Sequence, residues 1–335
     1  MSGEEEARWK RVDDRLHGYH GVGLADVLDC VGYLREEGDT VIAGGSLAWG
    51  LGNRLSDFDV VIVGAGTSPS RVPLEHWVKT LRVDAWTRSH EGVARLFAHA
   101  AEALESDAPL QGSFGTQEEE QQLKLLHRLA FGLRVDGPPL EGVDLAVARG
   151  LLAREYAERA RESVLIARLA LDAGRPLAAT TNARLAVEET LHMVLARRGV
   201  PFTGDKWLQE RLIGTAPDLR VHHDRFSALP EPGGEAAFVE DALALVAELG
   251  GRDSGADGAA WSAPDLVLHS PGGREHFLVA PGPGGMWELS AEEAQTWRGL
   301  SERDEWRDCS KAETGLLVGL YELGLAGLAW DKGVK

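Results

Sequence analysis

Residues 40–63 have the sequence TVIAGGSLAWGLGNRLSDFDVVIV, in which two apolar runs flank a glycine-rich turn. The runs at 40–43 and 58–63 predict two short buried strands. Gly44, Gly45 and Ser46 follow the first strand directly. Glycines let the backbone approach a ligand closely, and Ser46 is expected to begin a short helix, through Leu51, whose N–H groups bind an anion. The stretch therefore predicts a phosphate-binding turn between two strands.

The second strand begins with an Asp-x-Asp pattern. Side chains two apart on a strand share a face, so Asp57 and Asp59 are expected to lie together while Phe58 enters the core. Two neighbouring carboxylates repel each other and are costly to bury, unless a hard cation such as Mg²⁺ binds both. Asp84, in the next predicted strand, is the preferred third carboxylate, and Asp107 is the alternative. This set suits two metal ions and a displacement at phosphorus.

The rest of the chain alternates helical and strand-like segments, which predicts an α+β protein. Further strands are expected at residues 78–88, 266–268, 277–280, 286–289 and 328–330. Helices are expected at residues 26–37, 118–133, 143–173, 178–198, 207–213, 236–249 and 316–323. Ser290 with Glu293 predicts a capping box at the start of another helix. We expect three domains, at residues 1–112, 113–250 and 258–335, with a glycine-rich linker before the third.

Composition narrows the partners. The 335 residues carry a formal net charge of −18, which disfavours nucleic acid because phosphate affinity comes largely from Lys and Arg. No apolar run is long enough to span a membrane, and the charged N-terminus does not resemble a signal peptide. The two cysteines, Cys30 and Cys309, give no disulfide framework. The sequence therefore predicts a cytoplasmic protein that binds neither membrane nor nucleic acid.

The order Gly44-Gly45-Ser46 and then Ser56-Asp57-Phe58-Asp59 resembles the signature of the polymerase-β-like nucleotidyltransferase superfamily, in particular the kanamycin and lincosamide nucleotidyltransferases. The resemblance covers roughly residues 20–100. It implies a small mixed sheet with flanking helices, and transfer of a nucleoside monophosphate from an NTP with release of pyrophosphate. It implies that Gly45 and Ser46 hold phosphate, that Asp57 and Asp59 hold Mg²⁺, and that Asp84 is the third carboxylate.

The helical stretch resembles, more weakly, the helical domain of the antibiotic nucleotidyltransferases and the helical partners of minimal nucleotidyltransferase pairs. This resemblance rests on residues 182–189, continues to Gly199, and includes Lys206-Trp207-Leu208. It implies that the domain helps to form the acceptor site and supplies a carboxylate base, for which Glu188 and Glu189 are the candidates. A solvated helix face is the simpler interpretation of either glutamate. The Arg–His pair of the related helical RNases is missing at the matching place, which argues against RNase activity.

Three other polar features have local interpretations. Arg54 is a candidate phosphate contact, because it lies beside the Asp57 strand. Lys206 is a candidate for neutralising phosphate charge, or else a surface lysine whose stem covers Trp207. The run of residues 222–224, His-His-Asp, lacks further ligands at zinc spacing and is expected to be a polar loop.

The C-terminal stretch looks like the winged-helix modules that bind leader peptides or carrier partners. The leading hypothesis is a Mg²⁺-dependent enzyme that transfers NMP, with ATP as the expected donor, to a hydroxyl or carboxylate of a small molecule such as an antibiotic or a natural-product intermediate. One alternative is nucleotidylation of a protein, peptide or carrier-bound substrate recognised by the C-terminal module. Another is an inactive nucleotidyltransferase fold that serves as a binding protein.

Overall fold

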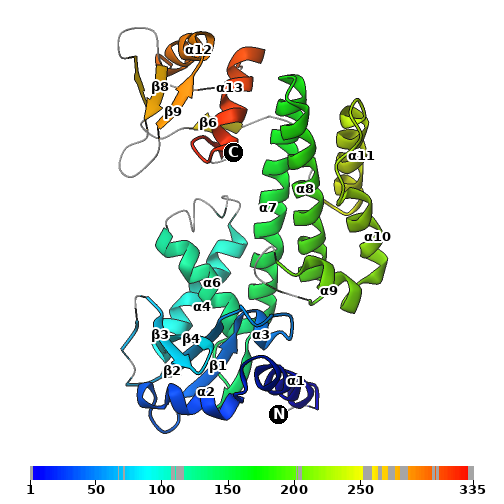
Figure 1. Cartoon of the computed structure of the whole chain (residues 1–335). Helices are drawn as coiled ribbons and strands as arrows, with labels where there is room; N and C mark the ends of the chain where they lie inside the picture. Colours follow the sequence, from blue (N-terminus) through cyan, green and yellow to red (C-terminus); the bar gives the residue numbers. More distant parts are fainter. Residues whose placement is uncertain are drawn as a thin grey trace. The chain divides into compact units, whose positions relative to one another are not determined.

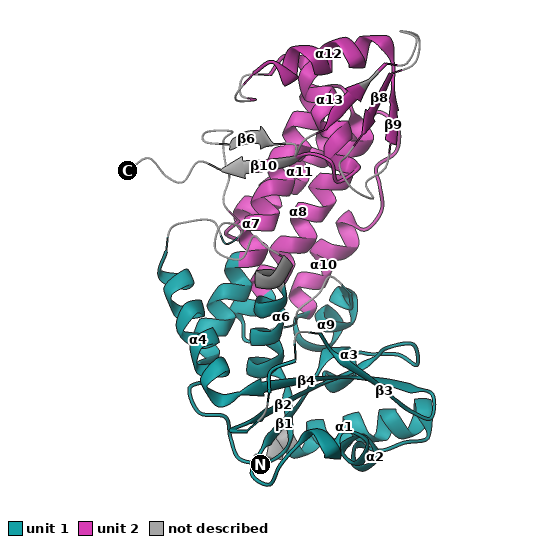
Figure 2. Ribbon diagram, turned by 90° about the vertical axis from the view of Figure 1, so that its left-hand side faces the viewer, with its two compact units in different colours: residues 1–154, 195–216 teal, residues 155–194, 217–335 magenta. Residues whose placement is uncertain are grey.

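The computed structural model describes residues 3–66, 68–70, 72–106, 110, 117–200, 202, 206–251, 259–262, 266–270, 276–279, 286–303, 306 and 309–330. The described chain divides into two compact units, coloured in Figure 2. Unit 1 comprises residues 1–154 and 195–216, and unit 2 comprises residues 155–194 and 217–335. The domain boundaries predicted near residue 112 and at 250–258 fall largely in segments outside the described residues, so they stay predictions.

Unit 1 is built on a mixed five-stranded sheet. Its strands are β1 (Thr40–Gly44), β2 (Phe58–Gly64), β3 (Leu74–Val78), β4 (Leu81–Ser89) and β5 (Leu133–Asp136). Their order across the sheet is β3-β4-β2-β1-β5. β2 and β4 are parallel, and the other neighbours are antiparallel. The small mixed sheet predicted for this region is confirmed.

Helices cover both faces of this sheet (Figure 1). One face packs on α1 (Gly3–His20), α2 (Leu24–Cys30) and the short α3 (Gly45–Ala48). Phe58, Val60 and Ile62 of β2 point into this core and are almost completely buried, as alternate residues of a strand should be. The other face packs on α4 (His90–Glu105) and α6 (Gln117–Phe131). The predicted carboxylates therefore belong to the α4 and α6 side.

Unit 2 is dominated by long helices. α7 (Leu145–Asp172) and α8 (Pro176–Arg197) are joined by a short turn and begin in one unit and end in the other. α10 (Pro217–Phe226) and α11 (Glu235–Glu248) follow, and α9 (Leu208–Thr215) belongs to unit 1. The helical stretch predicted between residues 143 and 249 is confirmed.

The C-terminal part combines short strands with two helices, as predicted. A three-stranded sheet contains β7 (Val267–His269), β8 (His276–Val279) and β9 (Met286–Leu289), and a separate pair contains β6 (Ala259–Ser262) and β10 (Gly327–Trp330). The helices are α12 (Ala291–Ser301) and α13 (Lys311–Glu322). The predicted capping box at Ser290 is confirmed, since its hydroxyl accepts a hydrogen bond from the backbone N–H of Glu293 at 3.2 Å.

Three local predictions were wrong. The helix expected over residues 26–37 ends at Cys30 and gives way to a short 3₁₀ turn (Gly32–Leu34), because Gly32 favours leaving the helix. The helix expected from Ser46 to Leu51 ends at Ala48, because the carbonyl of Ser46 accepts N–H groups from the following turn. The His-His-Asp run at 222–224 is part of α10, whose buried Leu219 and Phe226 lie two turns apart.

No helix among the described residues is both long enough and apolar enough to cross a bilayer. Neither Cys30 nor Cys309 forms a disulfide bond.

Candidate active site

The glycine turn lies where β1 ends against β2. Gly44 pairs with Asp59 in the antiparallel ladder. Gly45 has φ +72°, in the left-handed region that favours glycine. A β-carbon at Gly45 would lie 2.5 Å from Oδ2 of Asp59, so a larger residue would collide with that carboxylate. The turn therefore needs glycine both for its backbone shape and for the close approach of an acidic side chain.

Asp57 and Asp59 both face the α6 side of the sheet, and their surroundings differ. The Asp57 side chain is 42% exposed, at the start of β2, whereas the Asp59 side chain is 9% exposed. Arg128 of α6 neutralises Asp59, with Nη2 3.0 Å from Oδ1. Burial raises the pKa of Asp59, Arg128 opposes that rise, and the neighbouring charges of Asp57 and Asp84 add to it.

Asp84 lies beside Asp59 because β2 and β4 are parallel and in register at these two residues. Arg82, two residues earlier on β4, joins the group. Its Nη2 lies 2.7 Å from Oδ2 of Asp57 and 2.9 Å from Oδ2 of Asp84. The Asp84 carboxylate raises the pKa of Arg82 most strongly, and Asp57 adds to the effect. One guanidinium nitrogen therefore bridges two of the three aspartates.

The donor set has the chemistry that Mg²⁺ prefers, namely carboxylate oxygens on adjacent strands. Oxygens of Asp57 and Asp84 already share one positive group, Arg82, and Gly45 leaves room for the carboxylate of Asp59. As the side chains stand, no three His, Cys, Asp or Glu residues in the described part of the chain are arranged to hold a metal ion. The three aspartates are therefore the right type of ligand for a divalent cation. Their carboxylate oxygens are at present paired with Arg82 and Arg128.

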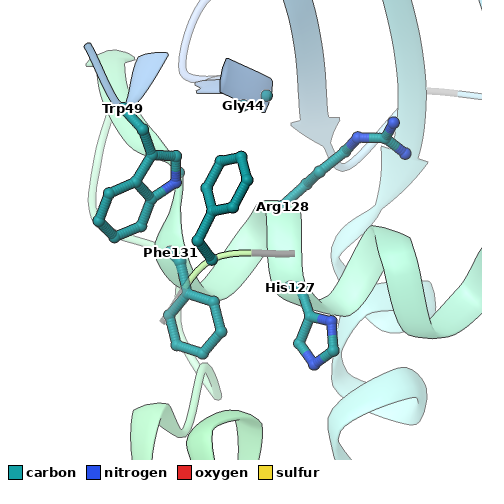
Figure 3. Close-up of a pocket in the computed structure, with 8 residues that line it drawn as sticks. Gly44, Trp49, His127, Arg128 and Phe131 are labelled. Atoms are coloured by element: carbon teal, nitrogen blue, oxygen red, sulfur yellow. The ribbon is translucent and has the colours of Figure 1, made fainter. Parts of the chain in front are cut away.

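A small pocket borders the glycine turn. The residues around it come from β1, the α3 region, α6, the residue after α6, and residue 202. It is lined by Gly44, Gly45, Trp49, His127, Arg128, Phe131, Gly132 and Phe202. Figure 3 shows Trp49 and Phe131 presenting aromatic rings, with the Arg128 guanidinium extending away from them. The ring of His127 stacks on Phe131 at 5.8 Å between centroids and 15° between planes.

His127 is an unusual member of this lining. Complete burial lowers its pKa to about 3, so the imidazole is neutral near pH 7. Its Nε2 is buried and makes no hydrogen bond within the described structure. The pocket therefore presents a neutral histidine, aromatic rings and one arginine next to the predicted phosphate-binding turn.

Of the other predicted site residues, two belong to unit 1 and two to unit 2. Arg54 is exposed in a turn. The pKa of His20 is lowered mainly by the burial of that histidine, and the positive charge of Arg54 lowers it further. Lys206 is exposed in unit 1. Glu189 is buried in unit 2 with its Oε1 2.6 Å from Nη2 of Arg159, and Glu188 lies 3.5 Å from Nε of Arg184. These four roles stay predictions, and the alternative carboxylate, Asp107, lies outside the described residues.

Sequence reasoning missed Arg82, Arg128 and His127. Arg82 was recognisable in principle, because it shares a strand face with Asp84 two residues later. Arg128 and His127 gave no comparable signal, since nothing in the pattern of a helix tells which strand its side chains will meet.

Comparisons with known proteins add little beyond this geometry. No family model matches the chain, and no curated protein matches it. Among solved structures, it is similar to a nucleotidyltransferase-like protein from Exiguobacterium sibiricum 255-15, with 13% identity and a TM-score of 0.35. The alignment covers 68% of this chain and 78% of that one. Similarity at this level carries no argument about activity, so the function rests on the site itself.

Proposed function

We propose that the chain is a nucleotidyltransferase that moves a nucleoside monophosphate from an NTP, with ATP as the expected donor, to a hydroxyl or carboxylate of a small molecule. The observation that carries the proposal is the meeting of Asp57, Asp59 and Asp84 on one sheet face beside the left-handed turn at Gly45. A site for a neutral ligand has no reason to gather three carboxylates, whereas a site for a metal–triphosphate complex needs them.

Different residues of the chain would bind the metal and the phosphates. Asp57, Asp59 and Asp84 would hold Mg²⁺, which when bound supplies the positive charge that stabilises phosphate oxygens during transfer. The backbone around Gly45 and Ser46 offers N–H groups to the phosphates, and Arg82 and Arg128 add positive charge beside them. These groups bind and orient the triphosphate for in-line attack.

The proposed transfer forms a bond between the acceptor oxygen and the α-phosphorus. The bond from that phosphorus to the bridging oxygen breaks, and pyrophosphate leaves. If the acceptor is a hydroxyl, its proton passes to a carboxylate. Asp84 is the candidate for this base within unit 1.

Binding tests the proposal most directly. Isothermal titration with a non-hydrolysable ATP analogue in Mg²⁺ should give heat with the wild type and little with Asp59→Asn, and the other NTP analogues would identify the base. Asp136→Asn is the matched control, because Asp136 is another aspartate of the same sheet and is ion-paired with Arg35. The proposal predicts that this control binds like the wild type. Equal binding by all three proteins would overturn it.

One observation favours a second candidate function, a nucleotidyltransferase fold that binds a partner without catalysis. The three aspartates are ion-paired with arginines, and within the described part of the chain their side chains are not grouped as a set of metal ligands. This candidate predicts that no NTP analogue binds, with or without Mg²⁺. Aspartate-dependent binding would exclude it.

A further inference from the structure

Arg82 occupies the position between two carboxylates that a cation would take. Its single Nη2 atom contacts both Asp57 and Asp84, at 2.7 and 2.9 Å. Mg²⁺ binds carboxylate oxygens at about 2.0–2.1 Å, much closer than a guanidinium does. Oxygens drawn in to that distance cannot also keep this shared contact with Arg82. Arg82 and a divalent cation therefore compete for the same atoms.

Arg82 is the more exposed of the two arginines. Its side chain is 42% exposed, as is that of Asp57, so solvent borders the contact. Arg128 is only 22% exposed and pairs with an aspartate that is 9% exposed. Its stem also packs against Gly44, and its guanidinium lies 5.8 Å from the centroid of the Trp86 ring. The contact of Arg82 with Asp57 is exposed on both sides, whereas the Asp84 side chain is 13% exposed. Displacing Arg82 is therefore less costly than breaking the Arg128 pair, which would leave a buried charge.

We propose that Arg82 is a resident counter-cation that holds Asp57 and Asp84 when no metal is bound and thereby weakens the binding of a free divalent cation. This inference rests on the proposed function, because that function requires the aspartates to bind a metal. Once displaced, the guanidinium of Arg82, which is still attached to β4, becomes a partner for a phosphate ligand. The site would then favour a metal that arrives with a nucleotide over a metal that arrives alone.

Metal binding without nucleotide tests the competition. Mn²⁺, a stand-in for Mg²⁺, would be titrated calorimetrically into the wild type, Arg82→Gln and the control Arg95→Gln. Arg95 is also an arginine of unit 1, 69% exposed and paired with Glu91 on α4. Arg82→Gln should bind Mn²⁺ roughly five- to tenfold more tightly than the wild type, because the guanidinium no longer competes for the oxygens of Asp57 and Asp84. Arg95→Gln should match the wild type.

A second variant and a second measurement keep the test informative if Arg82→Gln does not fold. Arg82→Met keeps the aliphatic stem and should give the same gain if the glutamine variant does not fold. In a thermal melt, Mn²⁺ should raise the Tm of either Arg82 variant more than that of the wild type, since a ligand stabilises the state that binds it. Adding Asp84→Asn to either variant should remove the gain. Equal or weaker Mn²⁺ binding by the folded Arg82 variants would overturn the inference.

The failure of this inference is distinguishable from the failure of the proposed function. Aspartate-dependent binding of the ATP analogue in Mg²⁺, together with unchanged Mn²⁺ affinity in Arg82→Gln, would refute the competition and leave the function standing. Absence of both nucleotide binding and Mn²⁺ binding from the wild type and every Arg82 variant would refute both.

Discussion

Acidification should destabilise unit 1 in part through one buried side chain, His127. Its pKa is about 3 in the folded chain, against about 6.5 for an exposed histidine, because burial penalises the charged imidazolium. Below pH 6.5 the unfolded chain takes up a proton at this residue that the folded chain does not. Folding stability must therefore fall as the pH falls, from about pH 6.5 down to about pH 3.

The size of the effect follows from the gap between the two pKa values. Each pH unit within the gap is worth about 1.4 kcal/mol for one group. At pH 5, about 1.5 units below the unfolded pKa, the loss is about 2 kcal/mol, and at pH 7 it is close to zero. A typical domain is stable by only about 5–15 kcal/mol, so the loss is large enough to measure.

The assay is urea unfolding of the wild type and His127→Gln at pH 7 and pH 5. The substitution has its own pH-independent cost, but the stability difference between the two proteins should shift by about 2 kcal/mol in favour of the variant at pH 5. Gly38→Ala is the control, because it strains a backbone position of positive φ without changing a titratable group. It should retain the wild-type pH dependence. Parallel pH profiles for the wild type and His127→Gln would refute the assignment of a buried neutral imidazole.

Three further substitutions probe the site and the C-terminal helices. Gly45→Ala should cost at least about 2 kcal/mol in urea unfolding, more than Gly38→Ala, because both glycines have positive φ but only the β-carbon at Gly45 would meet Asp59. Arg128→Met should cost about 3–5 kcal/mol by leaving the buried Asp59 unpaired, and adding Asp59→Asn should recover part of that loss; a double variant no more stable than Arg128→Met would contradict this. Ser310→Ala should cost about 1 kcal/mol in thermal or urea unfolding, because the Ser310 hydroxyl caps α13; no change would show that the cap is dispensable.

Local sequence rules were sufficient for the strands that carry the aspartates. The alternation around Asp57, Phe58 and Asp59 predicted a buried strand with its phenylalanine in the core, and Phe58 is completely buried. The glycine turn was predictable because few residues tolerate the backbone shape at Gly45. Strands β3 and β5 were not predicted, because four- or five-residue edge strands with exposed, charged residues have no clear apolar alternation.

The partners of the aspartates could not be predicted in the same way. Arg128 is 69 positions away from Asp59 in the chain, and their contact depends on how α6 packs across β1. The N-terminal helix α1 was missed because half of its residues are charged. Of its described side chains, only those of Val12 and Leu16 are completely buried. Tertiary packing decides both features, and single-sequence periodicity contains little of that information.

The parallel pairing of β2 with β4 also bears on how the chain reaches its native state. Bringing Asp57 and Asp59 next to Asp84 would concentrate three negative charges, yet Arg82 arrives on the same strand as Asp84 and is between them as soon as the strands pair. In small metal-dependent domains the energy of metal binding is the energy of folding, so chelators unfold them. Here the neutralising charges are encoded in the chain. A newly synthesised copy can complete unit 1 before it encounters any ion, and a chelator should leave its fold intact.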